Sequence, residues 1–334
     1  MTAHNELHTT IEALVQPGKG ILAADESTGT MGKRFTAIEL ENNSDNRQAY
    51  RSLLCTTPDL EKYINGVILF EETLTQGNND GTLLPEVLMQ KGIVPGIKVD
   101  KGLVTLANTA DEKITQGLDG LSERLQTYKE QGARFAKWRN VYAISDNTPS
   151  LSIIKSGAEV LGRYAATCQD LGIVPIVEPE VLIDGPHNID QCADVCEIVL
   201  HELFKALFVH QVQLEYIVLK PSMVLPGKEC KEQCSATEIA EYTLSVCLNH
   251  VPAAVPSINF LSGGQTPEQA TANLNAINSN GEQPWQLSFS YGRALQEPCL
   301  KAWQGNAENI NEAQNALLER AKLNAAAALG EYVE

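Results

Sequence analysis

The chain has 334 residues, of which 43% are hydrophobic and 20% are charged, so it can bury a large core and lacks the composition of a disordered protein. Its 25 basic and 42 acidic residues give a formal net charge of −17, which argues against a nucleic-acid partner or an anionic membrane surface. An anionic ligand must therefore be held by a local basic pocket that acts against the overall field.

The N-terminal stretch MTAHNELHTTIEALV lacks a cationic segment followed by an apolar one, so no secretion signal is predicted. No apolar run approaches the roughly 18 residues of a membrane span. We expect the eight cysteines to be reduced thiols of an intracellular protein. The pairs Cys192/Cys196 and Cys230/Cys234 have C-x3-C spacing, which predicts that each pair lies on one helix face and does not form a zinc site. The histidines have no ligand spacing either, so neither a metal nor another cofactor is predicted.

Short apolar runs recur along the chain, and a helical pattern follows most of them. The runs are 19–25, 65–72, 94–100, 134–142, 173–180, 216–222, 256–263 and 286–292. The helical patterns are 44–56, 118–132, 151–172, 188–211, 235–250 and 306–330. An N-terminal helix is expected before the first run, and 26–64 is long enough to hold an extra helix at the rim of the fold.

This alternation predicts β-α-β units and a parallel sheet. Eight runs without an intervening linker favour a closed (β/α)8 barrel that forms a single domain over 1–334, with an N-terminal and a C-terminal helix. An open doubly wound sheet is the alternative, but no G-x-G-x-x-G motif follows an early run.

Most runs end in charged or hydroxyl residues: Asp25, Glu71, Lys98, Lys137, Arg139, Glu178, Glu180, Lys220, Ser262 and Ser290. In a barrel these positions lie at the C-terminal face, where active sites of this fold are built. Alternation along a strand places Glu178 and Glu180 on the same side. A solvated rim position is the simpler interpretation for Glu71 and Asp100, but not for the whole set.

The run YIVLKPS places Lys220 at the end of a buried strand. A lysine, with an ordinary pKa near ~10.4, becomes nucleophilic when desolvation or neighbouring cations favour its neutral amine, and Lys98 and Lys137 could supply the cations. Such an amine forms a Schiff base with a ketone, which assists cleavage of an adjacent carbon–carbon bond. Glu178 and Glu180 suit the proton transfers, with one pKa raised by the like-charged neighbour.

Two loops late in the chain predict a phosphate site. FLSGGQTPEQ places glycines before a helix start at Thr266, and YGRA places Gly292 beside Arg293; backbone N–H groups at a helix start bind phosphate. Lys33 and Arg34, after a polar loop expected to be flexible, could hold a second phosphate or be merely solvated. LSGGQ also occurs in ABC-type ATPases, but those need a Walker A loop, which is absent from this sequence.

The peptides ILAADESTGTMGKR, GIKVDKG, FAKWR, PIVEPE, VLKPSMV, FLSGGQ and LSFSYGRALQ resemble class I, or Schiff-base, fructose-1,6-bisphosphate aldolase, from about Leu14 to about Val333. The resemblance implies a (β/α)8 barrel, usually a homotetramer that needs no metal. It also implies reversible cleavage of fructose 1,6-bisphosphate, a phosphorylated sugar, to dihydroxyacetone phosphate and glyceraldehyde 3-phosphate in glycolysis and gluconeogenesis.

The resemblance also implies roles for individual residues. Lys220 corresponds to the Schiff-base lysine, Glu178 to the main proton-transfer acid, and Glu180 to the neighbour that supports Schiff-base formation. Lys98 and Lys137 correspond to lysines that position charge and substrate, and Asp25 to the aspartate near the bond that breaks. The phosphate next to the ketone is assigned to Ser262, Gly263, Gly292 and Arg293, and the far phosphate to Ser27, Thr30, Lys33, Arg34 and Arg139.

Vertebrate members of this family end in a tail with a C-terminal tyrosine that assists proton exchange on the enamine. This sequence ends at ALGEYVE, and Tyr332 cannot be assumed to replace that tyrosine, so we expect another residue or water to act there, or slower turnover at that step. Two alternatives stay open: another Schiff-base sugar-phosphate aldolase or transaldolase, and a non-catalytic barrel scaffold. We expect a cytoplasmic protein, with the plastid stroma open if the chain is a processed form.

Overall fold

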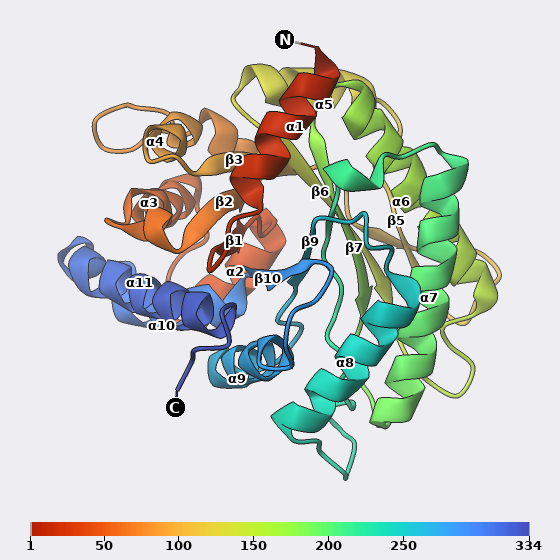
Figure 1. Ribbon diagram of the computed structural model, residues 1–334. Coiled ribbons are helices and arrows are strands. Elements are labelled where there is room, and N and C mark those ends of the chain that lie inside the picture. The colour runs from red at the N-terminus through yellow and green to blue at the C-terminus, as the bar shows by residue number, and fades with distance from the viewer. Residues whose placement is uncertain (1, 334) are drawn as a thin grey trace.

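The computed structural model describes residues 2–333. Its parallel strands close into a barrel in the order β1-β10-β9-β8-β7-β6-β3-β2 (Figure 1). The strands are β1 (Gly20–Ala24), β2 (Ile64–Leu69), β3 (Val94–Lys98), β6 (Phe135–Tyr142), β7 (Val174–Val181), β8 (Val218–Leu219), β9 (Ser257–Phe260) and β10 (Gln286–Tyr291). Each predicted apolar run overlaps one of these strands, so the (β/α)8 barrel is confirmed.

The helices surround the barrel, as Figure 1 shows. They are α1 (Ala3–Leu14), α2 (Thr28–Thr36), α3 (Ser44–Thr56), α4 (Leu84–Gln90), α5 (Leu121–Glu130), α6 (Leu151–Asp170), α7 (Ile189–Val209), α8 (Ala236–His250), α9 (Pro267–Asn278), α10 (Arg293–Trp303) and α11 (Ile310–Ala327). Short 3₁₀ turns are η1 (Leu60–Lys62), η2 (Glu71–Thr75), η3 (Leu214–Tyr216) and η4 (Ala307–Asn309), and β4 (Leu103–Thr105) pairs with β5 (Lys113–Thr115) as a hairpin. Among the helices of residues 2–333, none has the length and apolar character that a bilayer crossing requires.

Local sequence explains where several helices begin. α7, α8 and α9 each start at a capping box, formed by Asn188 with Gln191, Ser235 with Glu238, and Thr266 with Gln269. In each box the two residues satisfy backbone N–H groups that the first helical turn leaves unpaired. The helix start expected at Thr266 is therefore confirmed.

Two local predictions are wrong. The segment with Lys33 and Arg34 is not a flexible loop but the helix α2, because the Ser27 side chain caps its first turn by accepting from the Thr30 N–H. Cys230 and Cys234 do not share a helix face: they lie in the loop before α8, which begins only after the capping box at Ser235. Cys192 and Cys196 do lie together on α7.

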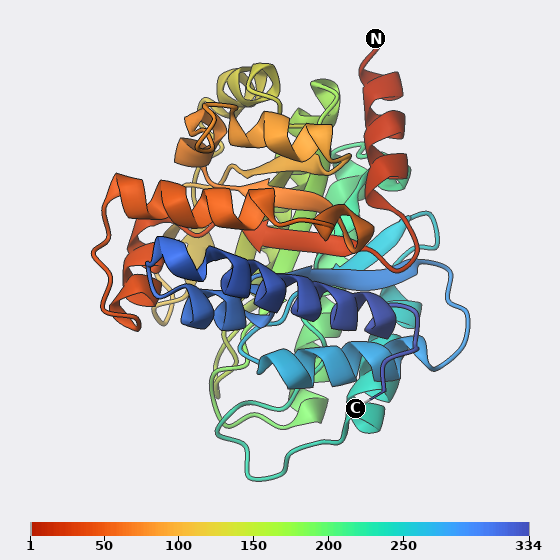
Figure 2. The same ribbon diagram turned by 90° about the vertical axis from the view of Figure 1, so that its left-hand side faces the viewer.

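The interior at the start of the strands is apolar and closed. Ile21, Phe135 and Ile176 pack there with Leu7 and Ile11 of α1, and Figure 2 shows α1 at the end of the barrel where β1 begins. The Phe135 ring occupies the space beside β3: a Cβ on Gly96 would lie 2.2 Å from its Cε2 atom. Because this end is filled, charged side chains can gather only at the other end, where the strands finish.

Candidate active site

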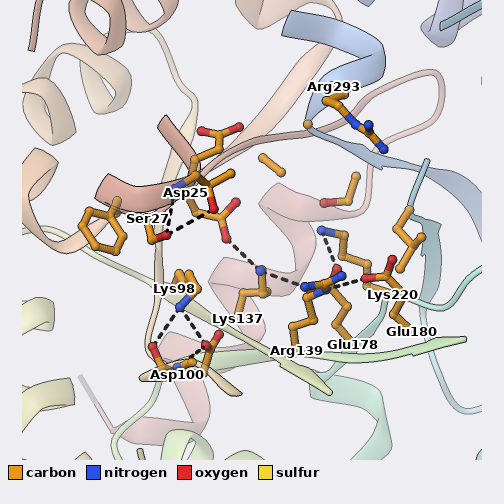
Figure 3. A pocket seen from close by; sticks show the side chains of 18 of the residues that line it. Asp25, Ser27, Lys98, Asp100, Lys137, Arg139, Glu178, Glu180, Lys220 and Arg293 are labelled. Carbon is orange, nitrogen blue, oxygen red and sulfur yellow. Dashed lines mark hydrogen bonds and ion pairs between the residues drawn. The ribbon is translucent and has the colours of Figure 1, made fainter. Parts of the chain in front are cut away.

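The strand ends surround a cavity of about 700 Å³. Among residues 2–333, every predicted site residue except Lys33 lines it. Asp25 follows β1, Lys98 ends β3, Lys137 and Arg139 lie in β6, and Glu178 and Glu180 lie in β7. Lys220 comes directly after the two residues of β8. The expected alternation is observed, since side chains two residues apart in β6 and β7 point into the same cavity (Figure 3).

Four of these side chains form a continuous chain of buried charges (Figure 3). Lys137 Nζ lies 2.7 Å from Asp25 Oδ2 and 3.1 Å from Glu178 Oε2. Glu178 Oε1 in turn lies 3.2 Å from Lys220 Nζ. The exposed fractions are 8% for Asp25, 4% for Lys137, and 3% for both Glu178 and Lys220. The nucleophile candidate and the proton-transfer candidate are therefore in direct contact, away from bulk water.

The pKa values of this chain follow from burial opposed by charge pairing. Burial favours the neutral carboxyl at Asp25, but Lys137 and Lys220 outweigh it and hold the pKa of Asp25 well below its usual range. The pKa of Glu178 is likewise lowered, because Lys137, Lys220 and Arg139 outweigh its burial. Burial opposes the charge on Lys137 too, yet Asp25 and Glu178 raise its pKa. The expectation that a like-charged neighbour raises the pKa of one glutamate does not hold for Glu178, because three cations surround it.

The flanking cations are each paired. Lys98 Nζ lies 2.7 Å from Asp100 Oδ1 and donates to the Asp100 carbonyl oxygen at 2.9 Å. Arg139 donates to Glu180 Oε2, and Glu180 and Glu178 raise the pKa of Arg139 against its burial. Asp100 is therefore a buried partner of Lys98 (Figure 3) and not a solvated rim residue. Because Lys98 is paired with Asp100, it does not act as an unpaired cation next to Lys220.

The loops after β9 and β10 face the same cavity. Ser262, Gly263 and Gly264 follow β9, and both glycines have positive φ, +34° and +85°, a backbone region that glycine adopts without strain. Gly292 is the N-cap of α10, and Arg293 is its first residue. The arrangement presents a helix N-terminus and a guanidinium to one side of the cavity, which suits a phosphate.

The residues assigned to the far phosphate separate into two groups. Ser27 and Thr30 line the cavity, with their hydroxyl oxygens 3.2 Å apart. Lys33 is exposed and lies outside it, because the α2 helix turns its side chain away. Arg34 Nη1 is 2.6 Å from Glu26 Oε1, and its Nη2 would be 3.7 Å from a Cβ on Gly292. Arg34 therefore lies beside the Gly292 loop rather than with Lys33.

Sequence reasoning missed the residues that hold Arg34. Glu26, only 9% exposed, also pairs with Arg51 of α3, whose Nη2 lies 3.0 Å from Glu26 Oε2. Gln296 of α10 donates to Glu26 Oε1 at 2.9 Å. Glu26 could have been suspected from the sequence, because it directly follows Asp25 at a strand end. Arg51 gave no such sign, because it lies in a helix whose polar spacing is ordinary.

Tyr332 lies at the opposite end of the barrel from the cavity. Its backbone N–H donates to Asn275 Oδ1 at 2.9 Å, near the end of α9. The neighbouring Leu329 packs on Gly18, just before β1. Tyr332 therefore does not reach the buried chain of charges in this structure.

Comparison with known proteins identifies the family. The chain matches the family model for fructose-bisphosphate aldolase class-I over residues 6–334. It is 56% identical over 317 residues to the cytosolic fructose-bisphosphate aldolase 4 of Arabidopsis thaliana, covering 95% of this chain and 81% of that one. It is 54% identical over 328 residues to the chloroplastic fructose-bisphosphate aldolase 1 of Pisum sativum, covering 98% and 92%.

A solved structure is similar over the whole fold. The fructose-bisphosphate aldolase of Plasmodium falciparum, crystallised with TRAP and a small-molecule inhibitor, superposes with a TM-score of 0.98. The two chains are 50% identical, over 99% of this chain and 96% of that one. With the family model matching nearly the whole sequence and the barrel superposing throughout, the chain belongs to the class I fructose-bisphosphate aldolases.

Proposed function

We propose that this aldolase cleaves fructose 1,6-bisphosphate reversibly through a Schiff base between the Lys220 amine and the sugar ketone. The observation that carries the proposal is the buried contact of 3.2 Å between Lys220 Nζ and Glu178 Oε1, at a cavity lined by Gly263, Gly292 and Arg293. An amine in that position reaches a ketone whose adjacent phosphate is held by the two loops.

Glu178 moves the protons of Schiff-base formation. Lys220 is one of the cations that lower the pKa of Glu178. When the amine adds to the ketone as a neutral carbinolamine, that cation disappears, so Glu178 then holds a proton more readily and can deliver it to the departing hydroxyl. The ion pair between Lys220 and Glu178 thus couples the addition of the amine to the loss of the hydroxyl.

Asp25 and Lys137 act on the other side of the reacting carbon atoms. Asp25 accepts the proton of the hydroxyl next to the bond that breaks, while Lys137, with its pKa raised by both carboxylates, stays charged and holds them in place. Cleavage leaves an enamine on Lys220. Its protonation and hydrolysis release dihydroxyacetone phosphate and restore the amine.

Borohydride trapping tests the covalent step. Reduction in the presence of dihydroxyacetone phosphate should convert the Lys220 amine into a secondary amine that carries the triose phosphate, identified by peptide mass. Lys220→Arg should abolish both this adduct and turnover in a coupled assay. Lys98 and Lys137, which share the cavity, serve as internal controls and should stay unmodified. An adduct on either of them, with Lys220 free, would overturn the proposal.

Substrate comparison tests the phosphate assignment and separates this reaction from that of another Schiff-base aldolase or a transaldolase. Rates on fructose 1,6-bisphosphate, fructose 1-phosphate and sedoheptulose 1,7-bisphosphate should favour the first. Arg34→Ala should raise KM for bisphosphates, and Lys33→Ala should change it less, because Lys33 lies outside the cavity.

We further propose that the chain acts as one (β/α)8 unit with α1 and α11, and assembles as a cytoplasmic homotetramer in glycolysis and gluconeogenesis. One similar aldolase is named as cytosolic and another as chloroplastic, so both compartments are possible for this chain. Light scattering on the purified chain tests the tetramer, and cell fractionation tests the compartment.

A further inference from the structure

Two cysteines and a histidine meet at the start of α7, behind the catalytic strands. Cys192 and Cys196 are one helical turn apart, and their Sγ atoms are 4.0 Å from each other. Cys192 is 3% exposed, Cys196 7% and His187 3%. None of the three takes part in the catalytic steps described above.

His187 is buried without satisfying its ring. Neither Nδ1 nor Nε2 has a hydrogen-bond partner within residues 2–333, a costly arrangement for a buried polar side chain. Its backbone carbonyl accepts from the Gly227 N–H at 2.8 Å, which fixes the loop that carries it. His187 lies five residues before Cys192, and it lowers the pKa of the Cys192 thiol.

The Cys192 thiol differs from the other buried thiols. Hydrogen bonding from Cys196 lowers its pKa against burial, and His187 and the Leu225 N–H lower it further. Burial instead raises the pKa of the Cys247 thiol to about 12. Since the thiolate is the reactive form of cysteine, Cys192 is the most easily oxidised of these buried sulfurs.

Only one layer of residues separates the cysteine pair from the active-site cavity. Cys192 lines a small void together with Leu261 and Gly263, and these two residues also line the active-site cavity. Cys196 lines a second void with Pro179, which lies between the two glutamates. Each void is large enough for about one water-sized molecule.

Ser222 connects the pair to both catalytic strands. It lines both voids, and its Oγ donates to the Val181 carbonyl and accepts from the Val181 N–H, each at 2.9 Å. This clamp joins the end of β7, next to Glu180, to the segment two residues beyond Lys220. A change in the packing of the cysteines would therefore shift Glu180 and Lys220 through this clamp.

We propose that Cys192 and Cys196 are a redox modification site, at which a hydroperoxide forms a reversible intrahelical disulfide that lowers aldolase activity. The effect on activity rests on the proposed function, whereas the formation of the disulfide does not. Residues four apart on a helix have Cα atoms about 6 Å apart, within the roughly 4.4–6.8 Å range of disulfides. The Cβ atoms of such residues are about 5–6 Å apart, beyond the roughly 3.5–4.5 Å of disulfides, so closing the bond also requires the start of α7 to distort.

The chemistry balances with the peroxide as oxidant. The Cys192 thiolate attacks one oxygen of H2O2, an S–O bond forms, the O–O bond breaks, and the departing hydroxide takes up the proton that the Cys192 thiol released, to become water. The Cys196 sulfur then attacks the sulfenic acid, an S–S bond forms and the S–O bond breaks. The hydroxide released takes the Cys196 proton. Two thiols lose two electrons and two protons, and the peroxide becomes two waters.

Peptide mapping tests disulfide formation without any variant. Asp194 lies between the two cysteines, so a protease that cleaves before aspartate separates them into two peptides. After peroxide treatment and blocking of free thiols, these peptides should stay joined and should part on reduction. Two blocked, unlinked peptides from the treated protein would overturn the proposal.

Variants test the roles of the three residues. Cys196→Ser should prevent the crosslink and leave a sulfenic acid on Cys192 that dimedone traps. His187→Gln should slow crosslinking most clearly below the Cys192 thiol pKa of about 6, where the thiolate fraction is sensitive to a rise in that pKa. The double variant Cys230→Ser with Cys234→Ser removes the other C-x3-C pair, which lies in a loop, and should crosslink like the parent. Equal crosslinking rates in the parent and in His187→Gln at every pH tested would overturn the part of His187.

Activity measured on the same samples tests the consequence. Peroxide should lower kcat of the parent severalfold and a dithiol should restore it, while Cys192→Ser should resist the treatment. A crosslinked protein with unchanged kcat would overturn the effect on activity. Failure of Lys220 trapping in the reduced protein would instead contradict the proposed function, so the two failures are distinguishable.

Discussion

At the scale of single residues, the buried charges of the cavity compensate one another. Asp25, Lys137, Glu178 and Lys220 alternate in sign along the chain of contacts. A buried ion is costly unless it is paired, so each of these residues depends on its neighbours. Catalytic and structural roles are therefore combined in the same side chains.

Removing the central cation should cost stability as well as activity. Lys137→Met leaves Asp25 and Glu178 buried without their shared partner, and we expect the free energy of unfolding to fall by about 3–5 kcal/mol. Urea unfolding measures this free energy. Lys62→Met, which removes the exposed pair with Asp59, should change it by less than about 1 kcal/mol. Equal effects of the two substitutions would contradict the importance assigned to burial.

The same pairs predict a loss of stability in acid. Lysines lower the pKa of Asp25 and Glu178 in the folded state, below unfolded values of about 3.9 and 4.3. Their contribution is therefore present above those values and is lost as pH falls through the folded pKa. The unfolding free energy should decline below about pH 4, and less steeply in Asp25→Asn than in the parent. Asp119→Asn, at an exposed position, should leave the slope unchanged.

At the scale of elements, the Phe135 ring fills space that two glycines leave at the end of the barrel opposite the cavity. Phe135 of β6 lies beside Gly96 of β3 in register, and a Cβ on Gly66 of β2 would lie 3.2 Å from the same ring. The glycines are thus required by close packing across three neighbouring strands.

Adding a methyl group there should destabilise the barrel. Gly96→Ala places Cβ 2.2 Å from Phe135 Cε2, so we expect a loss of about 1–3 kcal/mol or more, measured by thermal or urea unfolding. The double variant Gly96→Ala with Phe135→Leu, whose side chain at position 135 is smaller, should recover part of the lost stability. Gly29→Ala on α2, where nothing lies within 4 Å, is the matched control and should be neutral or stabilising.

At the scale of the whole molecule, the two ends of the barrel have separate tasks. α1 covers the apolar end, with Leu7, Ile11 and Leu14 packed on the strand starts, while the ionisable residues gather at the other end. The net charge of −17 disfavours an anionic substrate everywhere except at this local collection of lysines and arginines.

This separation predicts that stability and catalysis can be changed independently. Leu7→Ala with Ile11→Ala should lower the unfolding free energy by about 2–5 kcal/mol for each substitution, with kcat of the folded fraction unchanged. Chemical unfolding and active-site titration with borohydride measure the two quantities. Glu12→Ala, on the exposed side of α1, should alter neither. A fall in kcat per folded site would show that the ends are coupled.

The barrel and the side chains that its strands present were predictable from consecutive residues. Each strand is a short apolar run, and alternation along YIVLKPS, VEPE and FAKWR determines which side chains point inward. Eight such runs then place Lys220, Glu178 and Lys137 at one face. The resemblance to aldolases rests on those same peptides.

Only the tertiary structure decided how the charges pair. The contacts of Glu26 with Arg51, and of Lys137 with Asp25, join different elements. Lys33 points outward and Arg34 inward because α2 is a helix, and Lys98 is held by Asp100. Alternation and capping are encoded by neighbouring residues, so the sequence determined the elements and the face they build. Ion pairing and burial depend on distances between remote segments, which are fixed only when the barrel closes.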